Sequence, residues 1–160
     1  MYKRQVGISL EKFLGLKQGN NPLDFEDGEL KTFHLNERGA VKEDFRICSK
    51  WDKEYIKAKI ANILVVGINT DNIIVFCEVI HPLEHPIYSK YFDEEVDKIL
   101  EKGPTKCSQK DTEIWIAKTQ GRGHGSKSRS LYISRPAAHY LFYGEYPKGG
   151  RKAKKVLVGN

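Results

Sequence analysis

The chain has 160 residues, of which 39% are hydrophobic and 30% are charged, and its formal net charge is +6. This length suits one domain with a core that needs no disulfide or structural metal. No apolar run approaches the roughly 20 residues of a membrane span, and no apolar signal core follows the basic start, so we expect an intracellular protein with no membrane segment.

The charges are distributed unevenly along the chain. Residues 114–160 contain ten Lys or Arg and one acid, Glu145, whereas the preceding residues contain 17 basic and 20 acidic side chains. A basic face attracts phosphate and supplies a salt-sensitive, sequence-independent part of nucleic-acid affinity, although a solvated basic surface is the alternative. Cys48, Cys77 and Cys107 are widely spaced and odd in number, which favours reduced thiols.

The first half of the chain predicts alternating helices and strands. Residues 7–15 predict a short helix, and residues 28–35 a strand that pairs with a second strand over 41–49. Residues 51–61 have the apolar spacing of an amphipathic helix, with Lys59 near its end. Two β-branched runs, 63–68 and 73–80, flank a turn and predict a hairpin, and their continuous apolarity predicts central strands covered on both faces.

The second half continues this pattern. Residues 88–101 predict an amphipathic helix that ends at Gly103-Pro104, and residues 113–117 predict a strand. A further strand is expected over 131–134, followed by a helix from Pro136 to Gly144. The sequence therefore predicts a mixed α/β domain over 1–147, followed by a disordered basic tail over 148–160.

An acidic stretch, Asp24-Phe25-Glu26-Asp27-Gly28-Glu29-Leu30-Lys31, leads into the first predicted strand. Residues two apart in a strand share a face, so Glu29 and Lys31 point together while Leu30 points into a core. Two carboxylates that bind a hard cation beside an ammonium suit phosphodiester hydrolysis. An acidic hairpin with a surface lysine has the same pattern.

A basic, glycine-rich loop separates the strand at 113–117 from the strand at 131–134. Gln120 and Arg122 have the chemistry to read base edges, and Lys127 and Arg129 suit phosphates. The loop lacks apolar side chains that would order it by burial, so we expect it to settle on DNA; a flexible surface loop is the alternative. The DNA-facing candidates of this region are Lys118, Gln120, Arg122, His124, Lys127, Arg129, Tyr132 and Arg135.

These motifs resemble the PD-(D/E)xK nuclease superfamily, and within it the MutH-like family of mismatch-repair nicking endonucleases and related restriction endonucleases. Asp24 with Glu29-Leu30-Lys31 resembles the signature itself. Glu11 within Leu10–Gly15, Lys59 within Ala58–Val66, and Tyr132 within Arg129–Arg135 resemble three further family segments in the same order. The loop before Glu29 is shorter than in the relatives, which leaves open whether Asp24 or Glu26 takes the aspartate's place; the sequence context favours Asp24.

The resemblance implies a restriction-endonuclease-like fold, with a mixed central sheet flanked by helices, and Mg²⁺-dependent cleavage of double-stranded DNA at GATC-like sites, with Mn²⁺ as a substitute. Asp24, Glu29 and the Leu30 carbonyl would bind the metal ion, and Lys31 would position the water. Glu11 and Lys59 would support the metal ion and phosphate. A homodimer on DNA would suit double-strand cleavage. The alternatives are a catalytically inert DNA-reading module of the same fold and an RNA-binding protein with a basic tail.

Overall fold

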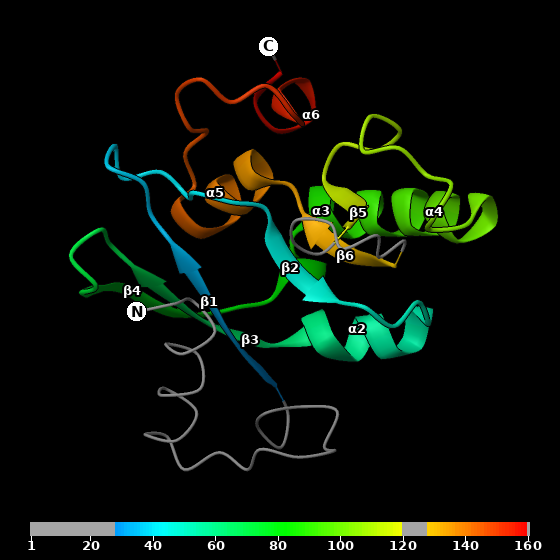
Figure 1. Ribbon diagram of the computed structural model, residues 1–160, viewed down its shortest axis with the longest axis horizontal. Coiled ribbons are helices and arrows are strands. Elements are labelled where there is room, and N and C mark those ends of the chain that lie inside the picture. The colour runs from blue at the N-terminus through cyan, green and yellow to red at the C-terminus, as the bar shows by residue number, and fades with distance from the viewer. Residues whose placement is uncertain (1–27, 120–127, 160) are drawn as a thin grey trace.

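A computed structural model describes residues 28–119 and 128–159 of the chain. Within these ranges the protein is a mixed α/β structure in which helices flank two sheets of three strands each. Figure 1 shows one sheet at the left of the molecule, the second near its centre, and the helices around them. The predicted α/β class is confirmed at this level.

The first sheet has the strand order β1-β3-β4, with β1 at Glu29–His34, β3 at Ile63–Ile68 and β4 at Ile74–Ile80. β3 and β4 form the predicted antiparallel hairpin. β1 and β3 run parallel, in a register from Glu29 opposite Ile63 to His34 opposite Ile68. A parallel pair needs a crossover connection, which here includes helix α2 (Lys53–Ala61).

The second sheet has the order β2-β6-β5, with β2 at Phe45–Cys48, β6 at Arg129–Ile133 and β5 at Trp115–Thr119. The prediction that the second strand pairs with the first is therefore wrong. β2 pairs antiparallel with β6, and the β-pairing between the two predicted segments is limited to an isolated bridge between Leu35 and Val41. The pairing of β2 with β6 joins segments that are far apart in the sequence, so local sequence does not encode it.

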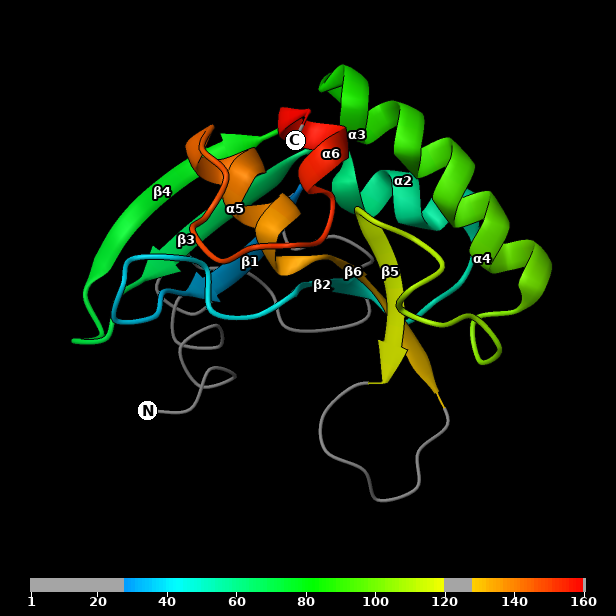
Figure 2. The ribbon, with the colours of Figure 1, turned by 90° about the horizontal axis from the view of Figure 1, so that it is seen from above.

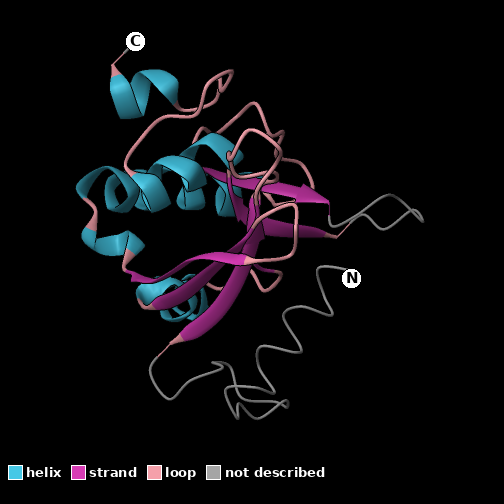
Figure 3. Cartoon of the chain, turned by 90° about the vertical axis from the view of Figure 1, so that its left-hand side faces the viewer, coloured by secondary structure: helices cyan, strands magenta, loops and turns pink. Residues whose placement is uncertain are grey.

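The main core lies between the two sheets and the helices. The helical segments beyond α2 are η1 (Pro82–Glu84), α3 (Pro86–Tyr91), η2 (Phe92–Val96), α4 (Asp97–Lys102), α5 (Arg135–Tyr143) and α6 (Lys154–Val158). Phe33 from β1, Ile60 from α2 and Trp115 from β5 meet in this core. Figure 2 shows α3 and α4 as one long helical rod beside the sheets, and Figure 3 shows helices packed along the strands. No described helix is long and apolar enough to cross a membrane.

β4 differs from its prediction as a central strand. It lies at the edge of the first sheet, and Ile74, Val75 and Val79 are each about half exposed. β3 is the strand with neighbours on both sides and is mostly buried. A continuous apolar run therefore indicates a strand here, but it does not tell a central strand from an edge strand.

The basic tail also differs from its prediction as a disordered arm. Helix α6 buries Leu157, and Ala153 before it is buried too. The Ala153 amide donates to Glu113 Oε2 at 2.8 Å, and the Tyr146 hydroxyl donates to the Lys152 carbonyl at 2.7 Å. These contacts attach the backbone of the tail to the domain.

Glu95 joins the long helical rod to the second sheet. Its side chain, which is buried, accepts hydrogen bonds from the backbone amides of Glu113, Ile114 and Trp115. Burial raises the pKa of Glu95, while the three amide donors act in the opposite direction. One side chain thus satisfies three backbone donors where β5 begins.

Replacing Glu95 by Ala leaves these backbone donors without an acceptor. Each buried donor left unsatisfied costs about 1–3 kcal/mol, so we expect Glu95→Ala to lower the free energy of unfolding by about 3 kcal/mol. Urea denaturation measures this loss. Glu94→Ala, an exposed neighbour in the same helical segment, is the matched control; equal losses in the two variants would contradict the role of Glu95.

His139 connects helix α5 to the segment before β2. Its Nδ1 accepts the backbone amide of Val41 at 3.1 Å, which requires a neutral ring at that nitrogen. Burial, and then the charge of Arg135, lower the pKa of His139 from its ordinary value of 6.5. The unfolded chain therefore binds this proton more readily than the folded protein does.

This difference predicts a pH dependence of stability. The contribution of His139 is complete above pH 6.5 and is lost as the pH falls from there through the lower pKa of the folded state. His139→Asn keeps an acceptor for the Val41 amide but does not titrate. We expect its free energy of unfolding to fall less than that of the wild type between pH 7 and 5.5; parallel curves would exclude this role.

Candidate active site

The candidate active site begins where β1 and β3 start side by side. The Glu29 amide donates to the Asn62 carbonyl at 2.9 Å, which fixes the first residue of β1 against the end of α2. Gly28 lies so close that an added Cβ would be 2.9 Å from the same carbonyl oxygen. A glycine at this position therefore allows the close approach of the two chains.

The register of this pair brings Lys59 to Glu29. Glu29 lies opposite Ile63, and Lys59 is in the last turn of the helix that leads directly into Ile63. Lys59 Nζ lies 2.8 Å from Glu29 Oε1, and the two side chains are only 13% and 6% exposed. The sequence analysis grouped these two residues through the family resemblance, and the structure brings them into direct contact.

Glu29 retains one carboxylate oxygen that could bind a ligand. Its Oε2 is buried and has no hydrogen-bond partner within residues 28–119 and 128–159. Such an atom fits a place in the coordination sphere of Mg²⁺, which prefers carboxylate oxygens. The described residues contain no cluster of three or more His, Cys, Asp or Glu side chains able to bind a metal ion. Among the described residues, the fit to Mg²⁺ therefore depends on the Glu29 carboxylate.

Lys31 lies on the same strand face as Glu29, as predicted. Its Nζ donates to the Ile47 carbonyl at 2.9 Å, so the ammonium points toward β2. Leu30 points to the opposite face, where it packs with Val66 and Ile68 in a small second cluster. Phe33, on the same face of β1 as Glu29 and Lys31, is part of the main core. The two charged residues therefore lie at the border of that core and not on an outer surface.

Three further side chains surround this group, and the sequence analysis did not select them. Cys48 is buried beside Ile47, and burial raises the pKa of its thiol although Lys31 and Lys59 act against that shift. The Tyr55 ring has Lys50 Nζ at 4.7 Å and Lys59 Nζ at 5.5 Å from its centre. The available sequence signal was the spacing of Tyr55 and Lys59, because an aromatic residue one helical turn before a lysine can lie under its ammonium group.

The DNA-facing candidates Lys118 and Tyr132 are packed together. Leu131 and Ile133 enter the main core, so Tyr132 points to the opposite face, as expected. Its side chain is nevertheless buried, with Lys118 Nζ 4.9 Å from the ring centre. Lys118 also forms an ion pair with Asp44 at 2.8 Å. Contact of Tyr132 with DNA would therefore require Lys118 to move.

Arg129 and Arg135 occupy different surroundings. The backbone amide of Arg135 donates to Asp44 Oδ1 at 2.7 Å, and its guanidinium reaches the Val41 carbonyl at 3.4 Å. Arg129 is the first residue of β6, and the Trp51 indole donates to its carbonyl at 2.9 Å. Asp44, which the sequence analysis missed, thus connects Lys118 with the start of α5.

The remaining predicted site residues lie outside the described ranges. They are Glu11, Asp24 and its alternative Glu26, and, in the basic loop, Gln120, Arg122, His124 and Lys127. Their proposed roles remain predictions from the sequence. Of the predicted catalytic set, the structure therefore describes Glu29, Lys31 and Lys59.

The ion pair between Lys59 and Glu29 predicts a stability effect. Removing one partner of a buried pair leaves the other charge uncompensated, which costs about 3–5 kcal/mol. We expect Lys59→Met to lower the free energy of unfolding by about 3 kcal/mol, and the double variant Glu29→Gln/Lys59→Met to recover most of that loss. Urea denaturation of both variants measures the coupling.

The matched control is Lys57→Met, because Lys57 is on the same helix with its side chain 40% exposed. This variant should lose less than about 0.5 kcal/mol. A loss in Lys59→Met that the second substitution does not reverse would show that Glu29 is not its main partner.

Comparison with known proteins provides no family assignment: no protein-family model matches the chain, and no curated protein is significantly similar to it.

Proposed function

We propose that the protein is a Mg²⁺-dependent DNA endonuclease with the restriction-endonuclease-like fold, of the MutH-like type. One observation carries the proposal. A buried carboxylate, Glu29, binds Lys59 through Oε1, keeps Oε2 unpartnered, and shares a strand face with Lys31. This is the acid-x-lysine arrangement that the sequence motif predicts for phosphodiester hydrolysis.

Each of these residues has a distinct role in the proposal. Glu29 Oε2 would bind the metal ion, with Asp24 and the Leu30 carbonyl as the other protein ligands expected from the motif. When bound, Mg²⁺ supplies Lewis-acid stabilisation of charge on the phosphoryl oxygens. Lys59 fixes the orientation of the Glu29 carboxylate through its 2.8 Å contact.

Lys31 orients the attacking water in this proposal. Its ammonium contacts the Ile47 carbonyl, a neutral acceptor, at 2.9 Å. A lysine ammonium carries three donors, the chemistry that hydrogen bonds to a water molecule or a phosphate oxygen require. Lys31 lies two residues after Glu29 on the same strand face, so its ammonium would act from the same side of the strand as the carboxylate proposed to bind the metal ion.

Double-stranded DNA is the proposed substrate, and GATC-like sequences are the expected target. The support is the sequence motif together with the excess of basic residues after residue 113. Cleavage of both strands at a symmetric site would suit two copies related by a two-fold axis.

A catalytically inert DNA-reading module is the second candidate. The observation in its favour is the ion pair itself, because Lys59 occupies one oxygen of the carboxylate that would bind the metal ion. In such a protein, the buried Glu29–Lys59 pair would serve only to join β1 to α2. The two candidates differ in whether divalent metal produces cleavage.

Plasmid nicking tests the proposal. We expect the wild-type protein to nick or linearise supercoiled DNA with Mg²⁺ or Mn²⁺ and to be inactive with EDTA. Glu29→Gln and Lys31→Met should each reduce the rate by at least about a hundredfold, because each removes a group that acts on the reacting phosphate. DNA binding by both variants should stay close to that of the wild type.

Glu37→Gln, which removes an exposed carboxylate from the turn after β1, is the control and should keep full activity. Binding without metal-dependent cleavage in the wild type would favour the inert module. Cleavage that survives Glu29→Gln would show that the active site lies elsewhere.

A further inference from the structure

A basic pocket lies apart from the Glu29 site, between the loop after α4, the start of β6 and the tail. Its volume is about 660 Å³, and its lining includes Thr105, Lys106, Ser108, Lys110, Arg129 and Lys152. Among the described residues, the lining contains four cations and no acid. Four like charges around one opening repel one another, and a bound anion would relieve that repulsion.

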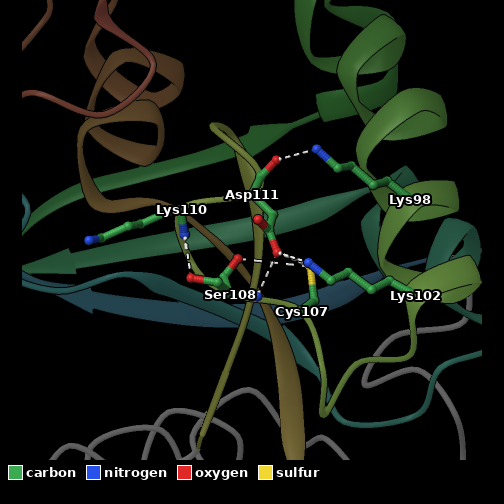
Figure 4. A network of polar contacts seen from close by, with 6 residues as sticks. All are labelled: Lys98, Lys102, Cys107, Ser108, Lys110 and Asp111. Carbon is green, nitrogen blue, oxygen red and sulfur yellow. Dashed lines mark hydrogen bonds and ion pairs between the residues drawn. The ribbon is translucent and has the colours of Figure 1, made fainter.

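The loop that carries Lys106 and Lys110 is fixed by its own acid. Asp111 Oδ2 accepts from Lys102 Nζ and from the Ser108 amide, both at 2.8 Å, and the Asp111 carbonyl accepts from Lys98 Nζ at 2.9 Å. The Lys102 ammonium, with the Ser108 amide, holds the pKa of Asp111 at about 2, so the acid stays ionised at neutral pH. Figure 4 shows Lys98 and Lys102 reaching Asp111 from one side.

The same figure shows Lys110 extending away from Asp111, on the side opposite to Lys98 and Lys102. The ion pairs of the described residues include none that involve Lys106, Lys110, Arg129 or Lys152. Because the loop acid is bound to α4, it does not neutralise the lysines of the pocket. Their charge is therefore available to a ligand.

The other walls of the pocket are formed by the tail and by the start of β6. Lys152 donates to the Gln109 carbonyl, which joins the tail to the loop without neutralising the lysine. Arg129 has a buried Nε without a hydrogen-bond partner. A guanidinium with an unused donor, beside lysines and hydroxyl groups, is suited to the several oxygens of a phosphate group.

We propose that this pocket binds a backbone phosphate of duplex DNA, as an anchor separate from the Glu29 site. The lining residues that the structure describes include no aromatic ring that could stack on a base, which favours a backbone phosphate over a nucleotide cofactor. Arg129 pairs with Thr119 at the base of the β5–β6 hairpin, next to the loop predicted to contact DNA. The choice of DNA as partner rests on the proposed function, whereas the pocket itself does not.

Salt-dependent binding tests the pocket. Affinity of the full chain for a duplex is measured by fluorescence anisotropy in EDTA, so that cleavage plays no part. Each phosphate contact contributes about 0.9 to the slope of log affinity against log salt. We expect Lys106→Gln/Lys110→Gln to reduce that slope by about 0.9 if the lysines share a phosphate and by about 1.8 if they do not, on duplexes of any sequence.

The matched control is Lys57→Gln/Lys90→Gln, which removes the same charge from α2 and α3. This variant should keep the wild-type slope to within about 0.3, a third of one phosphate contact. Equal changes in the two double variants, or no change in either, would overturn the pocket as a DNA anchor. Thermal denaturation of each variant confirms that the fold is retained.

Lysine acetylation of the wild-type protein gives a test that needs no variant. Bound duplex should protect Lys106, Lys110 and Lys152 and leave Lys57 and Lys90 reactive; equal reactivity with and without DNA would refute the proposal. Inorganic phosphate at millimolar concentration separates the two sources of the ligand. Full protection of the three lysines by phosphate alone, with none from DNA, would assign the pocket to a small phosphorylated molecule.

These results and the nicking assay have separate outcomes. Pocket protection without metal-dependent nicking keeps the anchor and removes the nuclease. Nicking that depends on Glu29, with wild-type binding by Lys106→Gln/Lys110→Gln, keeps the nuclease and removes the anchor.

Discussion

The parallel pairing of β1 with β3 is the constraint on which the candidate site depends. It places Glu29 opposite Ile63, and α2 ends just before Ile63, so Lys59 arrives within 2.8 Å of the carboxylate. A shift of one residue in this register would turn Glu29 to the other face of the sheet, where Leu30 packs with Val66. The charged pair is therefore a product of strand register and helix length together.

Several acids of this basic protein bind backbone amides or lysines within the fold. Glu95 accepts three amides at the start of β5, Asp44 joins Lys118 to the first amide of α5, and Asp111 ties its loop to α4. Each acid thereby orders a segment that carries cations. Acids thus fix the backbone segments that carry the surface cations. The pocket is an example, because Asp111 fixes the loop that carries Lys106 and Lys110.

Local patterns predicted most of the elements and the hairpin of β3 with β4, but not the pairings between distant segments. Periodicity identified the strand at Glu29, the helix before Ile63 and the helix after Ser134, because side-chain spacing is set by the element itself. The pairing of β2 with β6 and the edge position of β4 depend on contacts between distant segments, which no local pattern contains. The prediction of a disordered tail was wrong because it rested on the density of charge and not on Ala153 and Leu157, which are buried.

The same distinction applies to the sites. The motif Glu29-Leu30-Lys31 is local, so its shared strand face could be predicted. The family resemblance selected Lys59 as a support for metal ion and phosphate, but its contact with Glu29 joins distant segments and was not predicted. The basic pocket combines a loop after α4, the first residue of β6 and the tail, three segments that are far apart in sequence. Arg129 faces this pocket, and Lys118 packs on Tyr132 away from the core. Basic residues of one part of the sequence thus divide between two surroundings, so charge density along the chain does not predict which cations gather in one place.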